Sequence, residues 1–200
     1  MTDVEARAGT EQSLWEGPEA HHTFRLAQLQ LLLAVADSLG VQVKSVDRLA
    51  TYDFLAANPF SLLDGDDADR DARDRITLRL AGFSNEQLTY GSVGNRFANR
   101  RARIQHDLAL LVAHGLARVE SDRYGMTDAG RAFADRLSTV YADAYRMAAE
   151  IALTRLARLT DKKLNERVER IMGKSWLLID FLDDVQEVAT DQPSDGSGVA

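Results

Sequence analysis

The stretch Asn99–Thr127, NRRARIQHDLALLVAHGLARVESDRYGMT, contains the pattern that decides the fold. An arginine-rich start leads into apolar residues at helical spacing, and Gly115 follows at the position where helices usually stop. LARVE and YGM then have the composition of two short strands joined by a turn, and Thr127 can cap a following helix. This order predicts a winged helix with a small β-wing.

The helix within this stretch is predicted to have a core face and a basic edge. At about 100° per residue, one apolar stripe contains Phe97, Ile104, Leu108 and Leu111. The adjacent stripe contains Arg96, Arg100, Arg103 and Asp107. Arg101 falls nearer the apolar stripe, and a half-buried arginine must be paired. We therefore expect Arg101 to bind an acid such as Asp53 or the C-terminal end of a helix, so that Arg101→Ala lowers thermal stability.

Two apolar helices precede this element. Residues 24–39 are apolar over more than half of the helical circumference, which predicts a helix buried on two sides and ended by Gly40. A second helix over 46–58, capped by Ser45 or Asp47, must end before Pro59 because proline disfavours α geometry in the preceding residue. Both helices are candidate packing partners of the arginine helix.

Residues 60–92 are expected to form an irregular acidic insertion. The segment DGDDADRDARDR, Asp64–Arg75, has no apolar residue except alanine, which is typical of a solvated loop. A calcium loop is disfavoured because Gly65 is misplaced and no glutamate closes the loop. Ile76–Phe83 alternates apolar and polar residues, as in a short strand or the edge of a helix.

The region after the wing is predicted to be helical. The helical pattern runs over 128–159 with a break at Ser138, and continues over 161–172 and 175–188. The last helix is densely apolar, so it is expected to pack against a partner or back onto the first helix; its candidate contact residues are Trp176, Leu177, Phe181 and Leu182.

These patterns predict a mainly α protein with four parts. Residues 1–22 form a flexible N-terminal arm, 23–137 the winged-helix domain, 138–188 a helical extension, and 189–200 a disordered tail. The acidic start lacks the pattern of a signal peptide, and no apolar run is long enough to span a bilayer. We expect a soluble cytoplasmic protein with no membrane partner.

The chemistry of the chain argues against catalysis. There is no cysteine, the four histidines lack the spacing of a metal site, and YGSVGN has two glycines without the lysine of a phosphate loop. No nucleophile, base and orienting group stand near one another in a recognisable motif. We therefore expect no enzyme activity, no metal and no cofactor.

Nucleic-acid binding is the main functional candidate from the residues alone. The cluster of Arg96, Arg100, Arg101 and Arg103, with Arg118 and Arg123 on the wing, could contact several phosphates. Against this, the net charge is −7, and about 35 residues separate the second helix from the arginine helix where a helix-turn-helix has a short turn. Pairing of these arginines with the acidic loop or an acidic partner is an equal alternative.

Four features of the chain occur together in a known family: the DFL of Asp53–Leu55, Arg100-Arg101 before an apolar helix, Gly115-Leu116, and the helix centred on Tyr141. With these features, residues 24–156 resemble the middle components of bacterial ABC-three-component systems, which include the small subunit of Lamassu-type defence. The acidic segment departs from the His- and Pro-containing loop that the resemblance implies there.

The resemblance implies a non-enzymatic adaptor in defence against phages or plasmids. Its expected partners are an SMC-like or Rad50-like ABC ATPase and an effector, often a nuclease, and DNA is an expected partner through the complex. The alternative function is a winged-helix transcriptional regulator that binds DNA directly.

Overall fold

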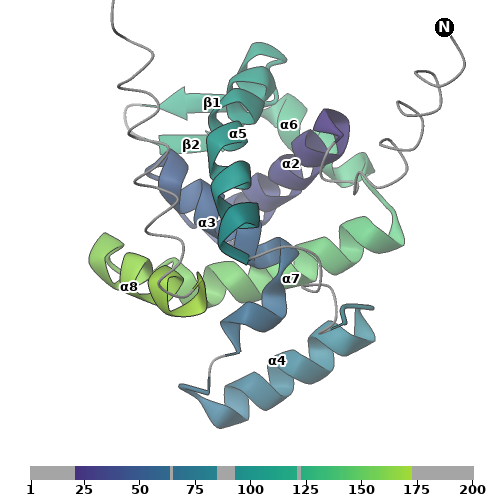
Figure 1. Ribbon diagram of the computed structural model, residues 1–200. Helices are drawn as coiled ribbons and strands as arrows, with labels where there is room; N and C mark the ends of the chain where they lie inside the picture. The colour runs from purple at the N-terminus through teal and green to yellow at the C-terminus, as the bar shows by residue number, and fades with distance from the viewer. Residues whose placement is uncertain (1–20, 64, 85–92, 121–122, 173–200) are drawn as a thin grey trace, which may run out of the picture.

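The computed structural model describes residues 21–63, 65–84, 93–120 and 123–172. It is mainly helical, with one two-stranded antiparallel sheet (Figure 1). In chain order the elements are α2 (His22–Ser38), α3 (Val46–Ala57), the 3-10 helix η2 (Pro59–Leu62), α4 (Ala68–Leu80), α5 (Val93–Ala113), β1 (Ala117–Glu120), β2 (Arg123–Met126), α6 (Asp128–Arg136), α7 (Val140–Leu156) and α8 (Asp161–Met172).

Helix α2 is the central element of the core. Consecutive residues Leu31, Leu32 and Leu33 are all buried, because α2 contacts α3, α5, α6 and α7 on different sides. The predicted burial of this helix on two sides is therefore confirmed. Gly40, with φ +64°, follows the helix end in the left-handed region that glycine adopts without strain.

Helix α3 has the predicted start and end. The Ser45 side chain accepts a hydrogen bond from the backbone N–H of Arg48, which satisfies one of the amides left open at a helix start. Asn58 is the C-terminal cap, and Pro59 begins η2. The buried face of α3 carries Asp53 among apolar residues.

The hairpin after α5 also agrees with its prediction. β1 and β2 pair in antiparallel register, with Ala117 opposite Met126. Val43, between α2 and α3, forms an isolated antiparallel bridge to Tyr124 of β2, so the loop after α2 extends the sheet by one residue. Thr127 caps α6 by accepting from the backbone N–H of Gly130.

The expected solvated loop over Asp64–Arg75 within the irregular segment 60–92 is wrong in its main part. Ala68–Leu80 form α4, whose N-terminus is capped by the Asp67 side chain. The helix is stable because Arg155 of α7 binds Asp71 at 2.7 Å and Asp74 at 2.6 Å. Burial alone would raise the pKa of Asp71, but hydrogen bonds from the Gly65 amide and Arg155 lower it.

The last described helices follow the predicted breaks. Leu137–Thr139 separate α6 from α7, where Ser138 was the expected break, and Thr139 caps α7. Leu164 and Val168 of α8 are buried, as their stripe predicted. The predicted helix 175–188, most of the N-terminal arm and the tail lie outside the described residues. Within the part that the structure describes, no helix is long and apolar enough to cross a membrane.

Candidate functional site

Helix α5 buries its predicted apolar stripe. Phe97, Ile104, Leu108 and Leu111 are each at most 3% exposed. Helix α5 crosses both α2 and α3 (Figure 1), and Phe97 meets Phe54 of α3 edge to face, with ring centroids 5.3 Å apart. This packing fixes the rotation of α5 and decides which of its arginines face solvent.

Arg100 is a core residue. Its side chain is 9% exposed and forms an ion pair with Asp53 of α3, whose side chain is 1% exposed. A second guanidinium nitrogen donates to the side-chain oxygen of Gln28 on α2. Arg100 therefore ties α5 to both helices that it crosses.

The expected partner of Asp53 was Arg101, and that assignment is wrong. Arg101 instead binds Asp47 at 2.9 Å, with the two side chains 36% and 70% exposed. On a helical wheel Arg100 and Arg101 lie at similar angles on opposite sides of the apolar stripe. Because α2 covers the side of Arg100, that arginine is buried, and its neighbour lies nearer the surface.

The buried ion pair continues into α7. The Tyr145 hydroxyl donates to the second oxygen of Asp53 at 2.7 Å, and the Gln28 amide donates to the Tyr141 hydroxyl. Burial, followed by the negative charge of Asp53, raises the pKa of Tyr145 well above its ordinary value, so this phenol stays protonated and remains a donor. The resulting polar network joins α2, α3, α5 and α7.

A second buried ion pair lies on the same side of α5. Asp107 binds Arg25 of α2 through two contacts of 2.8 and 3.2 Å. Asp107 was predicted to lie on a basic edge together with Arg100, but α2 covers both residues. Two of the four residues of the predicted basic edge, Arg100 and Asp107, are therefore buried.

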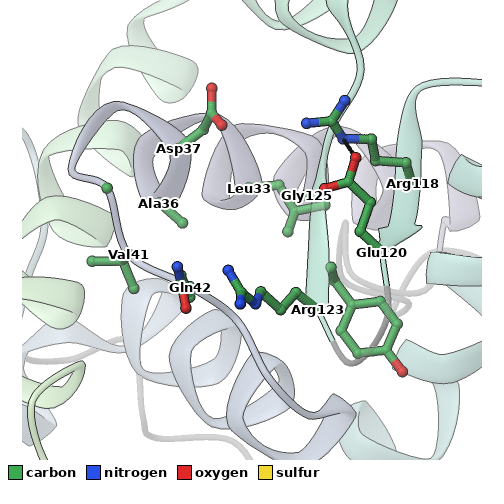
Figure 2. Close-up of a pocket in the computed structure, with 11 residues that line it drawn as sticks. Leu33, Ala36, Asp37, Val41, Gln42, Arg118, Glu120, Arg123 and Gly125 are labelled. Atoms are coloured by element: carbon green, nitrogen blue, oxygen red, sulfur yellow. Dashed lines mark ion pairs between the residues drawn. The ribbon is translucent and has the colours of Figure 1, made fainter.

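The other sequence-predicted cations are not gathered at one point. Arg103 is exposed on α5 and Arg96 is half exposed. Arg123 belongs to the hairpin and lines a hollow of about 270 Å³ between the end of α2, the loop after it and the hairpin. Figure 2 shows Arg123 beside Gln42 in this hollow, to which α5 contributes no residue.

The hollow itself carries mixed charge. Arg118 and Glu120 at its rim form an ion pair of 3.1 Å (Figure 2), and Asp37 stands at the opposite rim. Such a lining has no single charge preference for a ligand. Among the described residues, no group of three or more His, Asp or Glu is placed to hold a metal ion.

Sequence reasoning missed the contacts of two buried glutamines on α2. Gln28 and Gln30 are buried in the middle of an otherwise apolar helix, and buried amides need hydrogen-bond partners. Gln28 binds Arg100 and Tyr141, while Gln30 donates to the Gly130 carbonyl at 2.9 Å. Two glutamines on a helix predicted to be buried on two sides were the signal for these contacts.

Part of this architecture matches a known protein family. Residues 90–177 match the family model of the ABC-three component (ABC-3C) system Middle Component 2. The chain resembles an ABC-3C middle component. The predicted resemblance to ABC-3C middle components is thus confirmed over residues 90–177, which are less than half of the chain, and the match does not extend to the Lamassu type. No curated protein and no solved structure gave a significant match.

The match to the middle components includes α5, the hairpin, α6, α7 and α8. It contains Arg100, Asp107 and Tyr145, but Asp53 and Arg25 lie before it. The matched region therefore depends on α2 and α3 for the partners of its buried charges. A middle component implies partners within its three-component system.

Proposed function

We propose that this protein is a non-enzymatic adaptor of a Lamassu-type ABC-3C defence system. In this role it joins an SMC-like or Rad50-like ABC ATPase to an effector, such as a nuclease, in the bacterial cytoplasm. The observation that carries the proposal is the match of residues 90–177 to Middle Component 2. The buried charges around α5 support it, because they bind one another between helices and so serve packing.

The exposed apolar residues also support an adaptor. Val140, at the start of α7, is 87% exposed, while Ile76 and Leu80 of α4 are 61% and 85% exposed. These residues lie on two separate elements. Exposed apolar groups are favourable contacts for protein partners, and an adaptor needs more than one such surface.

Co-purification of the three components tests this proposal. We expect the effector to purify with a tagged ATPase only when this protein is co-expressed. Val140→Glu should weaken one of the two associations, whereas Lys162→Glu, at an exposed position of α8, is the control. The adaptor role is wrong if the ATPase and effector associate equally well without this protein, or if neither binds it.

A second candidate is direct DNA binding through a winged helix. We propose that α2, the Val43 bridge, α3, α5 and the hairpin form that fold, with α4 inserted between its second and third helices. The supporting observation is the exposed face of α5. Its only acidic residue, Asp107, is buried and paired, so the exposed side carries Arg103, Asn99, Gln105 and His106 without a carboxylate.

Salt-dependent binding separates the two candidates. If α5 contacts phosphates, Arg103→Ala should weaken binding to a DNA duplex and reduce the slope of log K against log salt by about one. Arg158→Ala is the control, because it removes the same charge from an exposed position after α7. It should change the DNA affinity and the salt slope less than Arg103→Ala does. Arg100 is unsuitable for this test because its loss would disturb the core. Equal effects of the two variants would exclude specific contact by α5.

A further inference from the structure

Helices α4 and α8 are both packed shallowly against the rest of the fold. Each buries two side chains among the described residues: Asp71 and Leu78 in α4, and Leu164 and Val168 in α8. Helices with so few buried side chains belong to the low-stability end of a fold and can open without global unfolding. The polar contacts of these two helices therefore decide how firmly each one is docked.

The start of α8 is held by Arg48 of α3. The side chain of Arg48 is 12% exposed and forms an ion pair with Asp161 in the first turn of α8. It also donates to the carbonyls of Ala157 and Leu159, between α7 and α8, at 3.2 and 2.9 Å. A cation after a helix is favourable because the last carbonyls have no partner within the helix. Arg48 therefore fixes the joint between α7 and α8.

The other end of α8 holds the connection that leads from η2 into α4. Arg167 donates to the Leu62 carbonyl at 3.2 Å, and Arg170 lies 3.3 Å from the carboxylate of Asp66. Arg155 of α7, which binds the acids of α4, also donates to the Leu62 carbonyl at 3.3 Å. The carbonyl of Leu62 is thus shared by α7 and α8, whereas Asp66 is held by α8.

The first turn of α4 depends on the course of this connection. The Gly65 N–H donates to the carboxylate of Asp71 at 2.8 Å, and the Asp67 side chain accepts from the Arg70 N–H at 3.0 Å. Asp66 lies between the two residues that reach the helix in this way. Because arginines of α8 hold Asp66, withdrawal of α8 removes a constraint from both contacts.

We propose that α8 is a clamp on α4, so that the two helices dock and open as one unit. While α8 is docked, its arginines fix the start of α4, and opening of α8 releases that start. Such coupling is reciprocal, so a change in the docking of α4 alters the docking of α8 by the same free energy. Helix α4 also carries Ile76 and Leu80, which the proposed adaptor role assigns to a partner, and occupation of that surface would be felt at α8. The coupling itself does not rest on that role, because it is measured on the protein alone.

Amide hydrogen exchange of the full chain at low urea concentrations, followed by mass spectrometry, tests the clamp. In the parent protein we expect the amides of α4 and α8 to open with one shared free energy. That free energy should lie below the value for α2, whose central amides exchange through global unfolding.

Loss of one contact made by α8 should be felt in α4. Arg167→Met removes the guanidinium and keeps an apolar stem, and we expect exchange in residues 66–80 to become at least about tenfold faster. If α4 opened without α8, the contact would persist in the open form, and its loss would leave exchange in α4 unchanged. Lys163→Met is the matched control, because it removes the same charge from an exposed position of α8. It should not alter exchange in α4.

The reverse direction is tested from the connection before α4. Asp66→Asn should speed exchange of residues 164–171, whereas Asp69→Asn, at an exposed position in the first turn of α4, should not. In a variant with both Arg167→Met and Arg170→Met, adding Asp66→Asn should have little further effect, because both cations that bind this carboxylate are already gone.

Four results would overturn the clamp. The first is a parent protein in which α4 and α8 open with different free energies, or only together with α2. The second is unchanged exchange of α4 in Arg167→Met, and the third is an equal increase in Lys163→Met. The fourth is full additivity of Asp66→Asn with the two arginine substitutions, which would show that Asp66 and α8 stabilise the fold separately.

Discussion

At the scale of single residues, the neighbouring arginines Arg100 and Arg101 contribute very different amounts to the stability of the fold. Removal of one partner from a buried ion pair costs about 3–5 kcal/mol, whereas an exposed pair contributes about 0–1 kcal/mol. We expect Arg100→Ala to reduce the free energy of unfolding by the larger amount, because it leaves Asp53 buried without its cation. Arg101→Ala should have the smaller effect, since its partner Asp47 is exposed. Urea unfolding of the two variants measures the difference, and equal losses would contradict the assignment.

Asp71 should make stability depend on pH. Its pKa is lowered in the folded protein, so the carboxylate stabilises the fold above its unfolded pKa of about 3.9, and this contribution is lost as pH falls through the folded pKa. Asp71→Asn should therefore cost about 1.5–3 kcal/mol near neutral pH and less below about pH 4. Asp69→Asn, exposed on the same helix, is the control. Thermal melts of the parent and of Asp71→Asn from pH 3 to pH 7 measure the effect. The prediction is wrong if the difference in melting temperature does not become smaller at acidic pH.

At the scale of elements, Gly130 sets the distance between α6 and the chain before β1. A Cβ at this position would lie 1.9 Å from the Leu116 carbonyl oxygen, which is backbone and cannot move independently. Gly130→Ala should therefore destabilise the protein by at least about 1–3 kcal/mol, although alanine normally favours helices. Gly125→Ala in β2 is the matched control, because its nearest new contact would be 3.9 Å away. Similar melting temperatures for the two variants would refute this close approach.

Helix α4 shows why an element can escape sequence analysis. Its first part, Ala68–Arg75, has no apolar residue except alanine, and the charges there predicted a solvated loop. Local signals did exist, since Asp67 caps the helix and acids occupy its first turn. What stabilises α4 is distant, namely Arg155 about eighty positions later in the sequence. Pairing across that separation cannot be obtained from local composition.

At the scale of the whole molecule, local patterns predicted the hairpin and the described helices other than α4. The apolar stripe of α5, the end of α3 before Pro59 and the cap at Thr127 depend on neighbouring residues only. The partners of the arginines depend on which helix covers each side of α5. Because α2 covers the side of Arg100, Arg100 forms the buried ion pair with Asp53 that was expected of Arg101. The predicted arginine cluster is therefore partly buried.

The family match covers a region that should not fold alone. Within residues 90–177, Arg100, Asp107 and Arg155 have buried partners that precede the region, namely Asp53, Arg25 and Asp71. In the fragment these charges would be solvated, but the apolar stripe of α5 would lose α2 and α3, which cover it. Burial of each large apolar side chain contributes about 1.5–3 kcal/mol, and a domain has a total stability of about 5–15 kcal/mol. We expect fragment 90–177 to lack a cooperative thermal transition, while fragment 21–172 retains one. Calorimetry of both fragments measures this. A native-like transition in fragment 90–177 would show that the helices before it are accessory, whereas its absence makes α2 and α3 part of the unit that the matched region needs to fold.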